Sequence, residues 1–122
     1  MNRPLVAFAG FVAAFSSAAM AARPLTANEH TSLRCAVAFA QVAAGQQRGE
    51  AAMKVYPSMA PRGREFFVRL AAQLMDDAGL DEAGIRAAAS AESSALARDG
   101  GPTGVMPFCL QLLDAQPGLP RG

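Results

Sequence analysis

Cys35 and Cys109 are the two cysteines of this 122-residue sequence, and His30 is its single histidine. A hydrolytic triad needs a nucleophile, a base and an acid that orients the base. A zinc site needs three or four converging ligands. One histidine and two cysteines supply neither set, and His30 falls on the polar side of a predicted helix. We therefore expect no enzyme activity, no metal and no cofactor.

Acidic and basic clusters offer two weaker kinds of site. Four carboxylates fall around one predicted helix junction: Asp76, Asp77, Asp81 and Glu82. The ligand spacing of a calcium loop is absent there, and Asp81 already serves as a helix cap. Arg62 and Arg64 lie near a helix start, where backbone amides and guanidinium groups bind anions together. Solvated arginines are the commoner outcome at such a place.

Methionine sulfur is the remaining candidate for metal binding, because copper(I) prefers soft ligands. The candidates are Met53, Met59, Met75 and Met106. In an alanine-rich helical protein, methionine more often fills gaps in the core. We therefore expect these side chains to pack rather than to bind copper.

The first 21 residues predict export. An apolar run from Leu5 to Phe15 follows one basic residue, and Ala19-Met20-Ala21 fits the small-residue rule of a signal-peptidase site. We expect residues 1–21 to be cleaved, so that the mature chain begins at Ala22 or Arg23 in the periplasm or outside the cell. The alternative is an uncleaved membrane anchor, which the alanine- and serine-rich second half of the segment disfavours. No later apolar run approaches membrane length, so we expect no membrane span after cleavage.

In an oxidising compartment two cysteines pair, so we expect a disulfide between Cys35 and Cys109. Free buried thiols are the alternative. The bond requires the two α-carbons to lie about 4.4–6.8 Å apart. Without Arg3 the chain has ten basic residues against ten acidic ones, so long-range attraction does not favour nucleic acid as a partner.

Capping and hydrophobic periodicity predict the first helix. Thr26-Ala27-Asn28-Glu29 matches the capping box, and helical spacing continues to about Ala44. Its polar positions form one narrow stripe that we expect to face solvent: His30, Arg34, Gln41 and Arg48. A helix that is apolar around most of its circumference is expected at the centre of a bundle. Residues 50–56 are expected to form a short helix that stops before Pro57.

Three further helices are expected at 61–78, 82–98 and 104–115, with a flexible tail at 117–122. Glu92 interrupts the apolar side of the third. No run alternates well enough to be a strand. The prediction is an all-α fold, a single domain over residues 22–116 in which four to five helices form a small bundle tied by the disulfide.

Three parts of the sequence resemble a group of small uncharacterised exported proteins of alphaproteobacteria that are helical and carry two cysteines. These parts are residues 35–39, residues 62–69 with 74–80, and residues 108–114. The resemblance covers most of the mature chain and implies no particular activity. In architecture and its two cysteines alone, the chain also resembles the periplasmic acid-stress chaperones, and no motif of that family transfers to a residue here.

Two classes of function follow from these observations, and an enzyme that uses carboxylates and arginines alone ranks third. The first is a non-enzymatic, chaperone-like or accessory protein that binds another periplasmic protein through a surface formed by Phe66, Phe67, Arg62 and Arg64. The second is a binder of small apolar ligands, with a cavity between helices lined by Phe39, Phe66, Phe67 and Phe108. A closed and filled core would favour the first class, whereas an open apolar pocket would favour the second.

Overall fold

A computed structural model describes residues 22–116; the predicted signal segment (1–21) and the predicted tail (117–122) lie outside the described residues. The elements in order are α1 (Ala27–Gln47), α2 (Ala60–Ala78), α3 (Glu82–Arg98), the short 3-10 helix η1 (Pro102–Gly104) and α4 (Met106–Asp114). No strand occurs among the described residues, which confirms the all-α prediction. None of the helices in this part of the chain has the length and apolar character needed to span a membrane.

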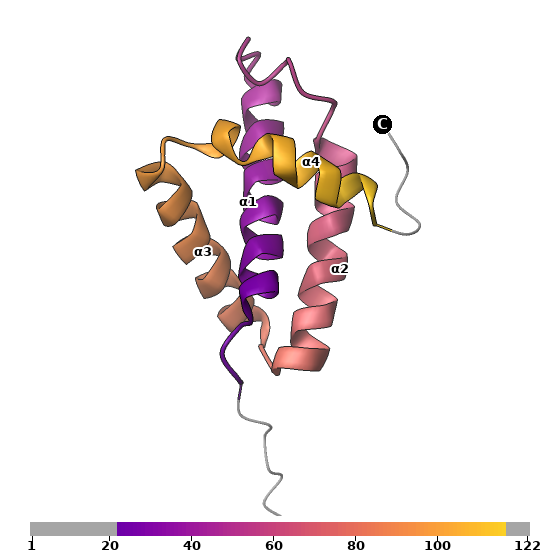
Figure 1. Ribbon diagram of the computed structural model, residues 1–122, viewed down its shortest axis with the longest axis vertical. Coiled ribbons are helices and arrows are strands. Elements are labelled where there is room, and N and C mark those ends of the chain that lie inside the picture. The colour runs from indigo at the N-terminus through magenta and orange to yellow at the C-terminus, as the bar shows by residue number, and fades with distance from the viewer. Residues whose placement is uncertain (1–21, 117–122) are drawn as a thin grey trace, which may run out of the picture.

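Helix α1 is the centre of the bundle. Helices α2 and α3 flank it and α4 crosses it (Figure 1), while α2 and α3 contact each other much less than each contacts α1. Its start is the predicted capping box, in which the Thr26 hydroxyl accepts from the Glu29 amide at 3.2 Å and the Glu29 carboxylate accepts from the Thr26 amide at 2.8 Å. Because most of its circumference is apolar, it can be covered from several sides at once.

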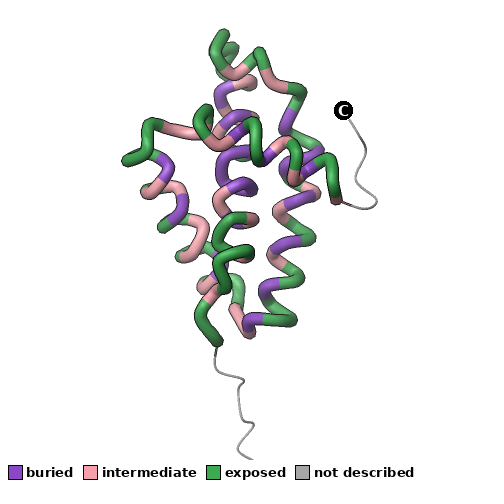
Figure 2. Tube along the Cα trace, in the orientation of Figure 1, coloured by how far each residue is buried: buried purple, intermediate pink, exposed green. Residues whose placement is uncertain are grey.

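Buried apolar side chains from all four helices form one core. Figure 2 shows buried segments recurring along each of these helices. The Phe39 ring of α1 meets the Phe66 ring of α2 edge to face, with centroids 5.4 Å apart. The two helices approach closely at Gly63, where an added Cβ would lie 2.9 Å from the Cβ of Phe39. Glycine at this position therefore sets the distance between α1 and α2.

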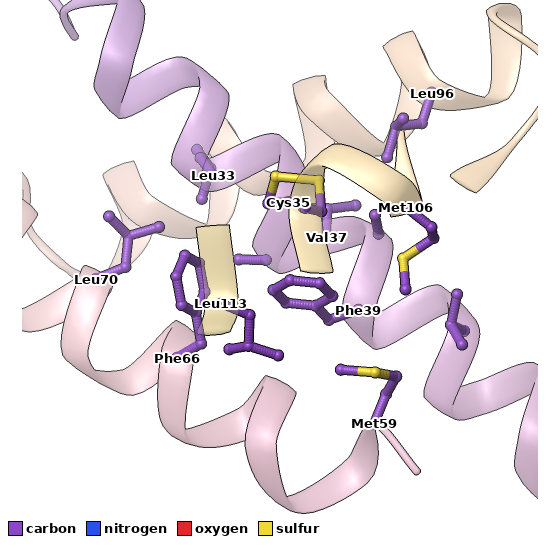
Figure 3. Packing of buried hydrophobic residues seen from close by; sticks show 14 of the residues in the cluster. Leu33, Cys35, Val37, Phe39, Met59, Phe66, Leu70, Leu96, Met106 and Leu113 are labelled. Carbon is purple, nitrogen blue, oxygen red and sulfur yellow. A yellow bond between two sulfur atoms is a disulfide. The ribbon is translucent and has the colours of Figure 1, made fainter. Parts of the chain in front are cut away.

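The disulfide attaches α4 to α1. The Cys35 and Cys109 α-carbons lie 5.2 Å apart, as the predicted bond requires, and both residues are 1% exposed. Met106 and Leu113, on either side of Cys109 along α4, are fully buried in the same core (Figure 3). The last helix is shorter than predicted, because residues 102–104 form the separate helix η1 before α4 begins at Met106.

The segment between α1 and α2 contains turns, so the short helix predicted at residues 50–56 is wrong. Helix α1 also continues three residues past the expected end at Ala44. The connecting segment is held by Gln46, whose side-chain amide nitrogen donates to the carbonyl oxygens of Met53, Tyr56 and Pro57 at 3.1, 3.2 and 2.9 Å. These carbonyls are satisfied by a side chain, so the segment does not need helical hydrogen bonds.

The polar stripe of α1 does not simply face solvent, which corrects the prediction. Glu92 of α3 is 9% exposed and accepts from Arg34 Nε at 3.1 Å, while its other oxygen lies 3.1 Å from His30 Nδ1. Gln41 donates to the Ser93 hydroxyl at 3.2 Å. His30, Arg34 and Gln41 thus contact α3, whereas Arg48 is exposed as predicted. Glu92 is a buried acceptor rather than an interruption of an apolar face.

Arg23 links the segment just before α1 to the end of α2. Its backbone amide donates to the Ala78 carbonyl at 3.0 Å and its Nε to the Asp77 carbonyl at 3.1 Å. Its two terminal nitrogens also donate to the two carboxylate oxygens of Glu29 at 2.9 and 2.7 Å. The hydrogen bonds from Arg23, followed by that from the Thr26 amide, lower the pKa of Glu29 from 4.5 to about 2.

This lowered pKa predicts a pH-dependent contribution to stability. A carboxyl group whose pKa is lower in the folded state stabilises the fold above its unfolded pKa, and loses that effect as pH falls toward the folded value. We expect wild type to melt at a higher temperature than Glu29→Gln at pH 6, and the gap to close between about pH 4.5 and pH 2. Melting curves across this range test the prediction.

Glu82→Gln is the control, because Glu82 is 84% exposed in the first turn of α3 and its surface ion pair contributes little. A gap for Glu29→Gln that is constant with pH would contradict it.

Candidate functional site

An open groove of about 650 Å³ lies between α1, α2 and α3. Helices α2 and α3 are joined by a tight connection in which Gly79 adopts φ 69°, and they separate as they leave it (Figure 1). The groove occupies the face of α1 turned away from α4, since Ala40 lies about 140° around the helix from Cys35. We call this space the interhelical groove.

Small side chains form the floor of the interhelical groove. They are Ala36, Ala40, Ala43 and Ala44, all on α1. Ala40 is exposed, although it lies in the middle of the central helix. Alanine leaves the space between the flanking helices unfilled, so the hollow results from residue size as well as from helix angle.

The walls are mostly apolar and the rim is polar. From α2 come Gly63, the half-buried ring of Phe67 and the exposed side chain of Arg64. From α3 come Ala89 and two serines, and Gln41 and Gln47 of α1 complete the rim. Arg64 is the one charged residue among those lining the groove, and no ion pair involves it within residues 22–116.

Two of the four residues predicted to form a binding surface are buried, which corrects that prediction. Phe66 is 5% exposed and Arg62 is 7% exposed. They are four residues apart on the face of α2 that meets α1 and α4, and there Arg62 Nη2 donates to Asp114 Oδ1 at 2.7 Å. Phe67 and Arg64 do lie together at the interhelical groove.

The predicted cavity lined by four phenylalanines is also wrong. Phe39 and Phe66 pack against each other in the core, and Phe108 is 55% exposed on α4. Phe67 alone of the four lines the interhelical groove. The floor was missed because alanine carries no chemical signal, although its recurrence at 36, 40 and 44 marks one helix face.

A second, smaller hollow of about 350 Å³ contains His30 and Glu92, with Phe108 at its side. Thr31, the hydroxyl-bearing residue among those lining this hollow, donates to the Ala27 carbonyl at 3.0 Å. A base without a nucleophile or a metal does not make a hydrolytic site. This cluster joins α1 to α3.

Three of the residues considered for metal binding serve the fold, whereas Met75 is 42% exposed and does not pack as predicted. Asp81 caps α3 by accepting from the Gly84 amide at 2.7 Å, and Met59 and Met106 are fully buried in the core. Within the described part of the chain, no three His, Cys, Asp or Glu side chains are grouped so that they could hold a metal ion.

Comparison with known proteins adds no relative to this description. No protein-family model matches the chain, and no significant match was found among curated proteins or solved structures. The two resemblances noted in the sequence stay predictions. A functional assignment therefore depends on the geometry of the interhelical groove.

Proposed function

We propose that this chain is an exported, non-enzymatic binding protein that holds a small apolar ligand in the interhelical groove. The observation that carries the proposal is an open groove of about 650 Å³ with an alanine floor. Ligand sites in proteins range from about 300 to 1,000 Å³ and combine apolar walls with a few polar groups. The disulfide is compatible with the oxidising compartment that the predicted export signal implies.

The contrast with the rest of the molecule supports this proposal. The core around Phe39 is filled by side chains that are fully buried. The groove remains open beside it, on the same central helix. Protein binding is the other class, and it would use exposed apolar side chains. The large ones among the described residues are dispersed over a loop and two helices: Val55, Val68, Met75 and Phe108. Because these side chains are dispersed, they support protein binding less strongly than the open groove supports ligand binding.

Filling the groove should weaken binding strongly. Ala40→Leu places a larger side chain on the exposed middle of the floor, and we expect it to weaken binding of an environment-sensitive apolar dye at least tenfold. Fluorescence titration of the folded, oxidised protein measures this. Ala87→Leu is the matched control, because Ala87 is exposed on α3 and does not line the groove.

Both variants should melt close to the wild-type temperature, since neither position is buried. Equal dye binding by all three proteins would place the dye elsewhere and would refute the groove as the binding site. Absence of dye binding by wild type would refute the proposed function.

A further inference from the structure

We infer that the ligand of the interhelical groove is a free fatty acid of about 12 to 14 carbons, with its alkyl chain along the alanine floor and its carboxylate on Arg64. The inference rests on the proposed function, and it specifies the ligand of the same site. Three observations lead to it: the length of the groove along α1, the lack of polar groups on its alanine floor, and the charge at its rim.

The interhelical groove is elongated along α1. Its α1 lining runs from Ala36, at one end of the alanine floor, to Gln47 on the rim, which at 1.5 Å per residue is about 17 Å. An extended alkyl chain with C–C bonds of about 1.5 Å advances about 1.3 Å per carbon, so 12 to 14 carbons match this length. A compact or flat ligand would leave most of the length of the groove empty.

A peptide matches the floor less well. An extended peptide would place its backbone amides and carbonyls against alanine methyl groups, where they find no partner and lose their hydration. A helix satisfies its own backbone and can lay an apolar face into an open groove, so a helical peptide is one of the competitors in the experiment below. An alkyl chain has no polar groups and is thin enough to enter.

The rim supplies one positive charge and no negative charge. Arg64 is the one charged residue among the groove-lining side chains, which include no carboxylate. Side chains of a helix lean toward its N-terminus, which directs Arg64 toward Ala60, near the groove end at Gln47. A carboxylate at that end leaves the alkyl chain to run past Phe67 toward Ala36.

The experiment compares dodecanoate with dodecanol as competitors for the apolar dye, below their aggregation concentrations. The two compounds share an alkyl chain and differ in head-group charge. Arg64 is exposed, so its ion pair is partly screened by solvent. We expect wild type to bind dodecanoate about three- to tenfold more tightly than dodecanol. Raising the salt concentration should reduce that ratio.

Arg64→Gln should bring the two affinities together by weakening dodecanoate and leaving dodecanol unchanged. Arg98→Gln is the matched control, because Arg98 is exposed at the end of α3, away from the groove. It should keep the wild-type ratio. Equal binding of acid and alcohol by wild type, or an unchanged ratio in Arg64→Gln, would overturn the inference.

Failure of the inference is distinguishable from failure of the proposed function. If the dye binds, Ala40→Leu blocks it and neither alkyl compound competes, then the groove binds another apolar ligand and the fatty-acid inference is wrong. If an amphipathic helical peptide displaces the dye and dodecanoate does not, the inference is wrong and the occupant is a protein segment. If the dye itself does not bind, both proposals are wrong.

Discussion

Reduction of the disulfide between Cys35 and Cys109 should lower the free energy of unfolding by about 4 kcal/mol. The bond joins positions 74 residues apart, so it removes much of the conformational freedom of the unfolded chain. A small domain has a total stability of only about 5–15 kcal/mol. The bond therefore accounts for a large part of the stability of this fold.

The native state should also change locally. Helix α4 has nine residues, too few to be stable alone in water. Without the bond, it is held by the packing of Met106 and Leu113 and by the ion pair between Asp114 and Arg62. We expect α4 to open first, exposing the core around Phe39.

Urea denaturation of the oxidised and reduced wild-type protein measures the effect. The doubly substituted protein, with Cys35→Ala and Cys109→Ala, is the control, since reductant should not change its denaturation midpoint. The double substitution should lower the free energy of unfolding more than reduction does, because it also removes two buried sulfur atoms. Equal midpoints for oxidised and reduced wild type would show that the bond contributes nothing.

Local signals in the sequence were enough to place most of the helices. The predicted bounds of α3, residues 82 and 98, agree with the structure, because Asp81 caps the start and glycines follow the end. The end of α2 at Ala78 was equally clear, since Gly79 adopts the left-handed conformation that glycine favours. The cysteine pairing followed from there being only two cysteines.

Features that depend on distant residues were not predictable in this way. The polar stripe of α1 was expected to face solvent because a local pattern does not show its partners. These partners, Glu92 and Ser93, lie more than 50 residues away in the sequence. The burial of Arg62 depends on α4 crossing α2 and supplying Asp114. Hydrophobic periodicity shows which face of a helix is polar, but not whether a polar partner covers it.

The interhelical groove was missed for a related reason. Its floor was visible as alanines at helical spacing, but that spacing marks a helix face without showing whether side chains from other helices fill the space over it. Whether the space is filled depends on the angle between α2 and α3, which no local pattern specifies. Phe67 was selected for its aromatic ring, and Arg64 for its charge near a helix start. Both residues line the groove. The predicted binding surface also included Phe66, which is buried.

Replacing Gln46 by alanine should destabilise the fold by about 2–4 kcal/mol, because its side chain makes four hydrogen bonds to backbone groups. Each contributes about 0.5–1.5 kcal/mol, and an unsatisfied half-buried carbonyl costs at least as much. Its Oε1 accepts from the Met59 amide at 3.0 Å, so the same side chain also fixes the start of α2. For a domain of this size, the loss corresponds to a fall of about 10–20 °C in melting temperature.

Gln47→Ala is the matched control. Gln47 is the next residue of the same helix, it is exposed, and its substitution makes the same change in helix propensity. Its melting temperature should stay within a few degrees of wild type. Hydrogen exchange gives the local measurement, because the Met59 amide should lose protection in Gln46→Ala and keep it in Gln47→Ala.

The Gln46 substitution should also affect binding. Met59 and Ala60 line the interhelical groove, so release of the 48–59 segment removes the support for one end of its α2 wall. Dye affinity should therefore fall in Gln46→Ala even at temperatures where the protein remains folded. If Gln46→Ala and Gln47→Ala melt alike, the four hydrogen bonds do not determine the path of this segment, and the groove does not depend on them.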